Sequence, residues 1–124
     1  MSGNVTNWQQ VYSSKLVSAE AATAQVRNGA RIYLGSMGAE PGLLTRVLAD
    51  SRVEDVEIVQ FKASEAASRL AAKGKSRFRL KTFFVGRRRD ALTDSLQADY
   101  VPLFHAEIPR FFKSRTIPID VAMI

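Results

Sequence analysis

The sequence predicts an α/β domain with an open, mostly parallel five-stranded sheet and helices on both faces. Short apolar runs alternate along the chain with segments of helical composition, which is typical of a parallel sheet. Two of these runs, Ile32–Leu34 and Phe83–Val85, contain only aliphatic and aromatic residues, as expected for strands buried on both faces. With 124 residues and 46% hydrophobic side chains, the chain is long enough for one domain, residues 1–124, and too short for two.

Three helices and two strands are predicted in the first half of the chain. They are, in order, a helix over Trp8–Lys15, a helix over Ala19–Asn28, a strand from Arg31 to Leu34, a helix over Pro41–Asp50 and a strand over Val56–Phe61. Ser18 is a suitable N-cap for the second helix, and Gly29 is a suitable stop. The third helix carries one apolar face, made of Leu43, Leu44, Val47 and Leu48. The first helix is expected to lie across the outside of the domain, with Trp8, Val11 and Tyr12 on one side.

The second half alternates three helices with three strands. They are a helix over Ala63–Lys73, a strand over Arg77–Gly86, a helix over Arg88–Leu96, a strand over Tyr100–Phe104, a short helix near Glu107–Lys113 and a strand over Ile117–Ile124. In Arg77–Lys81 charged and apolar residues alternate, which places the charges on a solvated face or at the strand's entry. Parallel strands are normally followed by a loop and a helix, so a stop at Ile124 suggests a fragment of a longer protein or one half of an assembly.

Composition narrows the class of protein. The sequence has no cysteine and a single histidine, which excludes disulfides and thiolate metal sites and argues against a metal cluster. No apolar run approaches the ~20 residues of a membrane span, and Met1–Asn4 lacks the basic-then-apolar pattern of a secretory signal. We therefore expect a soluble, cytoplasmic protein with no metal and no membrane partner, whose residues 1–7 are flexible.

The net charge of +6 lies entirely in the second half of the chain. Residues 1–62 carry six basic and six acidic side chains, whereas residues 63–124 carry twelve basic and six acidic ones. No acidic residue occurs between Arg69 and Arg89, a stretch that holds nine basic residues. An anionic partner, either a nucleic acid or a phosphorylated cofactor, is therefore a hypothesis to weigh.

The stretch best suited to a ligand is the loop after Ile32–Leu34. Gly35 and Gly38 permit a sharp turn or a close approach of the backbone to a ligand. Neither a dinucleotide fingerprint nor a Walker loop is present, and Glu40 would repel a phosphate. Two interpretations stay open: a tight turn without a ligand, or an approach to a thioester or acyl group. Ser36 lacks the G-x-S-x-G pattern of a nucleophile and is a candidate for ligand contact only.

Two charged groups follow predicted strands at the carboxyl edge of the sheet, where open α/β folds bind ligands. Arg87, Arg88 and Arg89 form either a solvated surface cluster or a contact for phosphates, an acidic substrate or a neighbouring chain. His105 and Glu107 follow the fourth strand. They are either an acid/base pair or a boundary histidine with a helix-capping glutamate.

Seven short segments share their order and spacing with a known family. They are Lys15–Ala21, Gly35–Pro41, Asp55–Val59, Phe83–Gly86, Ala98–Phe104, Glu107–Arg110 and Pro118–Ala122. Through these segments the chain, from about Trp8 onward, resembles the amino-terminal domain of the acetyl-CoA hydrolase/transferase family, which includes the 4-hydroxybutyrate CoA-transferases.

The resemblance implies a CoA-transferase-like, NagB/RpiA-type half of a two-domain protein. It implies an acyl-CoA:carboxylate CoA-transferase or an acetyl-CoA hydrolase of acetyl-CoA and acetate metabolism, with a coenzyme A thioester and a small carboxylate as substrates. The catalytic glutamate of such enzymes belongs to the second domain, so this chain has no catalytic residue and is expected to be inactive alone. That second domain would be supplied in cis or as a separate chain, and the complete protein is expected to be a homo-oligomer.

The resemblance also assigns substrate contacts by position, to Ser36, Met37, Gly38, Ala39, Glu40, Gly86 and Arg87. Two departures from the family pattern lie at the cleft edge: Arg87–Arg88 stands in place of Pro-Asn, and His105–Ala106 in place of an apolar-Ser pair. Both bear on substrate preference. A rival hypothesis is a stand-alone anion- or nucleic-acid-binding module that uses the stretch from Arg69 to Arg89, and it predicts binding that weakens steeply with salt. A third is a structural subunit that pairs with a separately encoded catalytic half.

Overall fold

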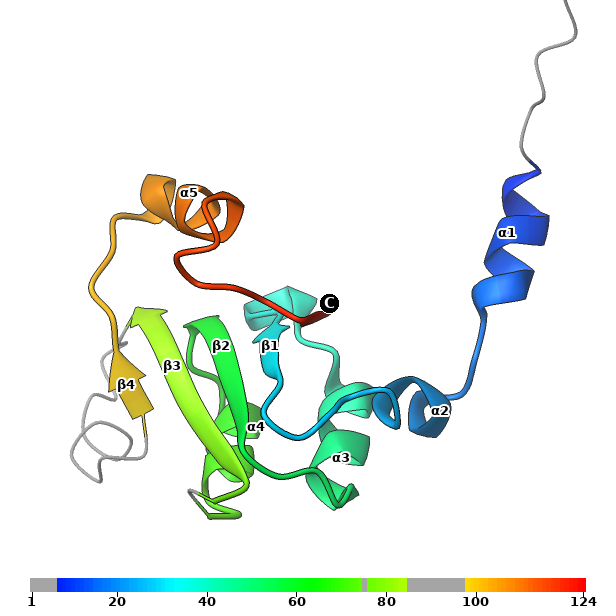
Figure 1. Cartoon of the computed structure of the whole chain (residues 1–124), viewed down its shortest axis with the longest axis horizontal. Helices are drawn as coiled ribbons and strands as arrows, with labels where there is room; N and C mark the ends of the chain where they lie inside the picture. The colour runs from blue at the N-terminus through cyan, green and yellow to red at the C-terminus, as the bar shows by residue number, and fades with distance from the viewer. Residues whose placement is uncertain (1–6, 75, 85–97) are drawn as a thin grey trace, which may run out of the picture.

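The computed structural model describes residues 7–74, 76–84 and 98–124. Its strands form one five-stranded sheet in the order β4-β3-β2-β1-β5, and all of its pairings are parallel. The strands are β1 (Arg31–Leu34), β2 (Val56–Lys62), β3 (Phe78–Phe84), β4 (Ala98–Tyr100) and β5 (Val121–Met123). The predicted open, parallel α/β sheet is therefore confirmed (Figure 1).

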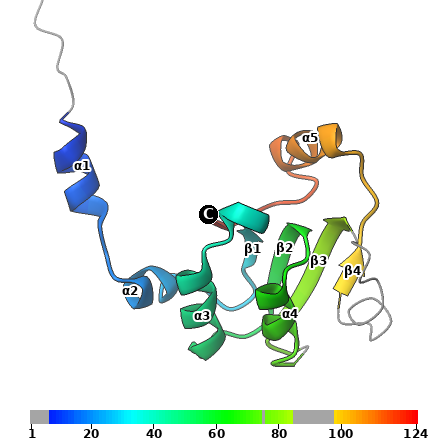
Figure 2. The same cartoon turned by 180° about the vertical axis from the view of Figure 1, so that it is seen from behind.

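Helices cover both faces of this sheet. They are α1 (Trp8–Lys15), α2 (Ala19–Thr23), α3 (Gly42–Asp50), α4 (Glu65–Ala71) and α5 (Ile108–Lys113). Two short 3₁₀ helices also occur, η1 (Met37–Ala39) and η2 (His105–Glu107). α3 and α4 lie on one face of the sheet with α2 beside α3, and α5 lies on the other face (Figure 2).

Two hydrophobic clusters fill the space between the sheet and these helices, and neighbouring residues of β2 belong to different clusters. Ile58 belongs to the cluster that includes Leu48 of α3 and Leu70 of α4. Val59 belongs to the cluster that includes Ile108 of α5. Because successive side chains of a strand point to opposite faces, the central strand is buried on both sides.

The second predicted helix is shorter than expected and ends at Thr23 instead of Asn28. The side chain of Asn28 accepts a hydrogen bond from the backbone N–H of Glu54 at 3.0 Å, and Gly29, at φ +77°, donates to the carbonyl of Glu54 at 3.2 Å. These contacts tie both residues to the turn before β2, and the positive φ of Gly29 is incompatible with a helix. A contact distant in sequence thus overrides local helical propensity.

The last two strands are also shorter than predicted. β4 covers Ala98–Tyr100 instead of Tyr100–Phe104. The N–H of Val101 still donates to the carbonyl of Thr82 at 2.9 Å, but the next residue, Pro102, has no N–H with which to continue the ladder. β5 begins only at Val121. Before it, the carboxylate of Asp120 accepts from the backbone N–H of Arg31 at 2.8 Å, so a side chain takes the place of a ladder bond.

Three expectations about packing are wrong. Leu43 is 61% exposed, because the buried face of α3 runs through Leu44, Thr45 and Leu48 and leaves Leu43 at its border. Phe84 is 50% exposed, since it lies at the very end of β3. α1 does not lie across the domain: it has no buried residue, and it stands away from the sheet (Figures 1 and 2).

Several sequence predictions lie outside the described residues. They concern residues 1–6 of the start, the helix over Arg88–Leu96 and the candidate residues Gly86, Arg87, Arg88 and Arg89. The structure begins at Asn7, whose side-chain oxygen accepts from the N–H of Gln9 at 3.2 Å and so caps α1.

A row of charged side chains crosses three strands on the face that also carries α5. Glu57 of β2 is only 8% exposed, and its carboxylate bonds Arg31 of β1 through one oxygen and Lys81 of β3 through the other, at 2.8 Å to Lys81. Burial raises the pKa of Glu57, but its hydrogen bonds to Lys81 and Arg31 and their positive charges together hold that pKa below its ordinary value. The charged form of Glu57 therefore stabilises the sheet.

Glu57→Gln is expected to lower the free energy of unfolding at pH 7 by about 1 to 2 kcal/mol, because two partly buried cations lose their carboxylate. A carboxyl group with a depressed pKa in the fold contributes stability above its unfolded pKa of about 4.3 and loses it as the pH falls through the folded pKa. The difference between the two proteins should therefore be widest near neutral pH and shrink with acidification below about pH 5. Urea denaturation at a series of pH values measures this difference in stability. The control is Glu54→Gln, which removes an exposed carboxylate just before β2. An equal response of both variants would contradict the prediction.

Candidate functional site at the carboxyl ends of β1 and β5

The strand order changes direction between β1 and β5. From β1 the sheet extends through β2, β3 and β4 on one side, and β5 then adds on the other side. In open parallel sheets a ligand crevice forms at such a switch point, outside the carboxyl ends of the strands. Residues 35–41 follow β1 directly, so this loop leaves the sheet at that switch point, close to the end of β5 (Figure 1).

Gly35 fixes how the loop leaves the sheet. Its N–H donates to the carbonyl of Met123 at 2.8 Å, which extends the pairing of β1 with β5 by one residue. A Cβ atom at Gly35 would lie 2.2 Å from the backbone oxygen of Ala39, so only glycine allows the loop to fold back this closely. Gly38, by contrast, has no atom within 4 Å of such a Cβ.

Gln60 anchors the loop from the neighbouring strand. It is fully buried, and its amide nitrogen donates to the carbonyl of Gly35 at 3.0 Å. Its amide oxygen accepts from the N–H of Ser64 at 2.9 Å, and the hydroxyl of Ser64 in turn caps α4 by accepting from Ala67 at 3.0 Å. The side chain therefore joins the loop after β1 to the start of α4. Sequence reasoning missed Gln60, although a lone amide inside the apolar run Val56–Phe61 is a signal that its polar atoms need buried partners.

Residues 36–40, which follow these anchors, are exposed or partly exposed. The hydroxyl of Ser36 accepts from the backbone N–H of Lys62 at 3.3 Å, so it ties the loop to the end of β2. Met37 has a φ of 58°, which is uncommon for a residue with a side chain, and its side chain is 70% exposed. Gly38 and Ala39 are exposed, and Glu40 is partly exposed. The structure thus places the five predicted loop residues at the carboxyl edge of the sheet.

Aromatic rings line the same edge beside this loop. The imidazole of His105 stacks on Phe61 with ring centroids 4.2 Å apart, and Phe84 stacks on Phe61 with centroids 6.1 Å apart. The carboxylate of Glu107 accepts from the backbone N–H of Phe104 at 3.3 Å. These contacts agree with the second interpretation of the pair, a boundary histidine with a capping glutamate. No role was predicted for Phe61, because an apolar strand carries no signal for which of its aromatic side chains will lie at the carboxyl edge of the sheet.

Cations between Arg69 and Arg89 make contacts within this chain. The ion pairs are Arg69 with Glu65 at 3.2 Å, Arg79 with Asp55 at 2.9 Å and Lys81 with Glu57 at 2.8 Å. Arg77 donates to the backbone oxygens of Ala49, Ser51 and Val53, where α3 ends. Carbonyls at a helix C-terminus attract a cation, so Arg77 has a structural role. These contacts give four of the nine basic residues partners in the fold and lend no support to a nucleic-acid surface.

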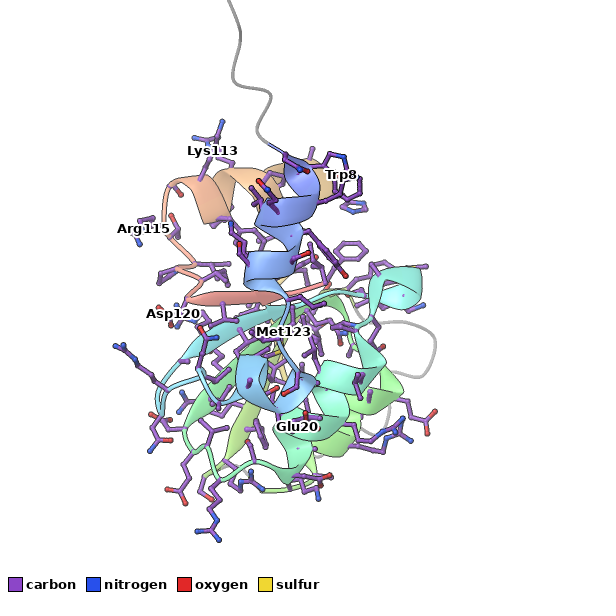
Figure 3. All side chains as sticks on the ribbon, turned by 90° about the vertical axis from the view of Figure 1, so that its right-hand side faces the viewer. Trp8, Glu20, Lys113, Arg115, Asp120 and Met123 are labelled. Atoms are coloured by element: carbon purple, nitrogen blue, oxygen red, sulfur yellow. The ribbon has the colours of Figure 1, made fainter. Side chains whose placement is uncertain are left out.

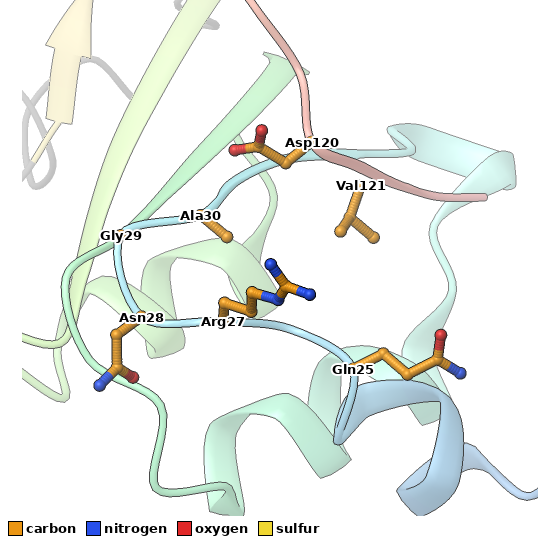
Figure 4. A pocket seen from close by; sticks show the side chains of 7 residues that line it. All are labelled: Gln25, Arg27, Asn28, Gly29, Ala30, Asp120 and Val121. Atoms are coloured by element: carbon orange, nitrogen blue, oxygen red, sulfur yellow. The ribbon is translucent and has the colours of Figure 1, made fainter.

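A hollow of about 510 Å³ lies at the opposite edge of the sheet, at the amino ends of β1 and β5 (Figure 4). It is lined by Gln25, Arg27, Asn28, Gly29, Ala30, Asp120 and Val121. Asn28 and Asp120 already hold backbone N–H groups of Glu54 and Arg31. The hollow lies at the amino ends of these strands, whereas open parallel sheets bind ligands outside the carboxyl ends, so we place the candidate site at the carboxyl edge.

Two negative findings apply to residues 7–74, 76–84 and 98–124. No helix there has the length and apolar character needed to cross a membrane. No group of three or more histidine, cysteine, aspartate or glutamate side chains there is arranged to hold a metal ion.

The parallel sheet, with helices on both faces and a glycine loop at its switch point, defines the chain as an open α/β domain. The family model for the acetyl-CoA hydrolase/transferase N-terminal domain matches residues 2–124, and the chain belongs to this family. It is 34% identical over 120 residues to the 4-hydroxybutyrate coenzyme A transferase of Clostridium kluyveri, a match that covers 94% of this chain. The family resemblance in the sequence is therefore confirmed.

Solved structures show the same fold. RipA from Yersinia pestis superposes with a TM-score of 0.77 over 94% of this chain at 22% identity. A variant of the decarboxylase AibA/AibB superposes with a TM-score of 0.60 over 83% of this chain at 16% identity. The match spans only 28% of the Clostridium kluyveri transferase and 30% of the RipA chain, so both relatives are more than three times as long as the matched region.

Proposed function

We propose that this chain forms one wall of the acyl and carboxylate pocket of a CoA-transferase or acetyl-CoA hydrolase, with a coenzyme A thioester and a small carboxylate as substrates. The observation that carries the proposal is the loop 36–40, held at the switch point of the sheet by Gly35 and Gln60 while Met37, Gly38 and Ala39 stay exposed. Ser36, Met37, Gly38, Ala39 and Glu40 would contact the substrate, together with Gly86 and Arg87. The cytoplasm, where acyl-CoA is made and used, is the proposed location.

The covalent step belongs, in this proposal, to a glutamate of a second domain. A carboxylate that attacks a thioester needs a preorganised site from which water is excluded. The loop 36–40 lies open to solvent, and one wall cannot exclude water. Glu107 caps the backbone of Phe104, and in this proposal it does not replace the missing nucleophile. The second domain would face the loop, either in the same polypeptide or as a separate chain, within a homo-oligomer.

The 124-residue chain alone is expected to release no thiol from acetyl-CoA, with or without acetate or 4-hydroxybutyrate as acceptor. A hybrid that joins it to the part of the Clostridium kluyveri transferase beyond the matched region is expected to turn over. In the hybrid, Met37→Ala should raise KM for acyl-CoA by about tenfold, because an apolar contact is worth about 1 to 3 kcal/mol in a substrate pocket. Leu43→Ser, at an exposed site on α3, is the control. Turnover by the isolated chain, or a Met37→Ala hybrid with unchanged kinetics, would refute the proposal.

A further inference from the structure

The first helix presents an apolar face that nothing in the described chain covers. Trp8, Val11, Tyr12 and Leu16 recur at the spacing of one helix face, and they are 69%, 39%, 59% and 63% exposed. Val17 continues this surface and is 52% exposed. Gln9, Gln10, Ser13 and Ser14 form the opposite, polar face. Figure 3 shows Trp8 at the far end of the helix.

A helix of this length needs a packing partner. α1 has eight residues, and isolated helices below about 12 to 15 residues are marginal in water. Its ends are satisfied locally, by Asn7 at the start and by the N–H of Leu16, which donates to Tyr12 at 3.0 Å. These caps give the helix its bounds but bury no apolar surface. The packing that stabilises α1 must therefore come from outside the described residues.

We propose that α1, with Leu16 and Val17, is a docking arm for the second domain of the complete protein. This inference rests on the part of the proposed function that gives the protein a second domain. The family relatives extend far beyond the matched region, which is 28% of the Clostridium kluyveri transferase and 30% of RipA. A polypeptide of that length has ample surface to cover five apolar side chains.

The chemistry of the arm disfavours other partners. Lys15 is its one charged residue, whereas helices that bind membranes or nucleic acids are rich in lysine and arginine. A second copy of the chain is a poor occupant, because a stable interface between separate proteins needs about 20 to 30 residues on each side. A domain on the same polypeptide needs far less, since linkage gives it a high effective concentration.

Trp8 is the only tryptophan of the chain and reports directly on the arm. Labelled with 5-fluorotryptophan, the chain gives one fluorine NMR resonance, which can be titrated with the separately produced remainder of the Clostridium kluyveri transferase. The resonance is expected to move, and its shift between H₂O and D₂O to fall at least by half, as Trp8 leaves solvent. Val11→Ser combined with Tyr12→Ser should weaken binding about tenfold or more. Leu43→Ser, equally exposed but on α3, should leave the affinity within about twofold.

Three results would overturn the docking arm. Binding of the remainder with an unmoved Trp8 resonance would do so, and so would equal losses from the arm variants and from Leu43→Ser. A resonance that shifts with the concentration of the chain alone would assign the face to a second copy. If the remainder does not bind as a separate chain, the covalent hybrid decides: the arm variants must lower its melting temperature and Leu43→Ser must not.

The hybrid also separates this inference from the proposed function. An active hybrid whose stability ignores the arm variants would remove the docking arm and leave the proposed function standing. An inactive hybrid in which Trp8 is protected from solvent would remove the proposed function and leave the docking arm standing.

Discussion

Gly35→Ala is expected to destabilise the protein by about 2 to 3 kcal/mol, the upper part of the range for overpacking a tight site. The new methyl group would lie 2.2 Å from the carbonyl oxygen of Ala39, and a backbone atom cannot move aside as a flexible side chain can. Relief requires either the loop or the end of β1 to shift. Either shift strains the hydrogen bonds that Gly35 makes to Met123 and to Gln60, at 2.8 and 3.0 Å. Urea denaturation followed by circular dichroism measures the loss.

Gly38→Ala is the matched control, because it adds the same methyl group three residues further along the same loop. No atom lies within 4 Å of the new position. Its effect on the free energy of unfolding should stay within about 0.5 kcal/mol. If Gly38→Ala costs as much as Gly35→Ala, the close approach at Gly35 is not what fixes the loop.

Gln60→Leu is expected to lower the free energy of unfolding by about 2 to 4 kcal/mol. Leucine has a similar volume, so the cost comes from the carbonyl of Gly35 and the N–H of Ser64, which both lose a buried partner at about 1 to 3 kcal/mol each. The loop should also become mobile, because its tie to α4 is gone. Amide hydrogen exchange is therefore expected to speed up for residues 35–41 ahead of the rest of the sheet.

Two further variants isolate the cause. Gln25→Leu makes the same change at an exposed position and should be nearly neutral. Gln60→Glu keeps an acceptor for Ser64 but places a carboxylate against the carbonyl of Gly35. A buried carboxyl group without a cation has a raised pKa, so it destabilises the fold increasingly as the pH rises above about 4.3. A Gln60→Glu variant as stable at pH 7 as at pH 5 would show that the position is wetter than the structure indicates.

The position of the loop 36–40 in the sheet was predictable because its signals are local. The apolar run Ile32–Leu34 followed by Gly35 and Gly38 marks a strand, a turn and a place where the backbone can approach a ligand. In a parallel sheet the end of such a strand lies at the ligand edge, and residues 36–40 are found there. The substrate contacts assigned to residues 36–40 stay predictions, as do those of Gly86 and Arg87, which lie outside the described residues.

The misses have a common origin in contacts between segments distant in sequence. The buried state of Gln60 depends on Gly35, 25 residues earlier, and the early end of α2 depends on Glu54. The stack of His105 on Phe61 joins the end of β2 to the loop after β4. No periodicity within a window of ten residues carries such information.

The sequence by itself determined the order of the described strands and helices, their parallel arrangement and the position of the glycine loop, because alternating patterns and glycines act through local backbone preferences. Only the tertiary structure decided that Gln60 and Gly35 lock this loop to β5 and α4, and that α1 finds no surface in the described chain to pack against. The reason is that these hydrogen bonds and packing contacts join segments distant in sequence, and which segments meet is decided only when the sheet assembles.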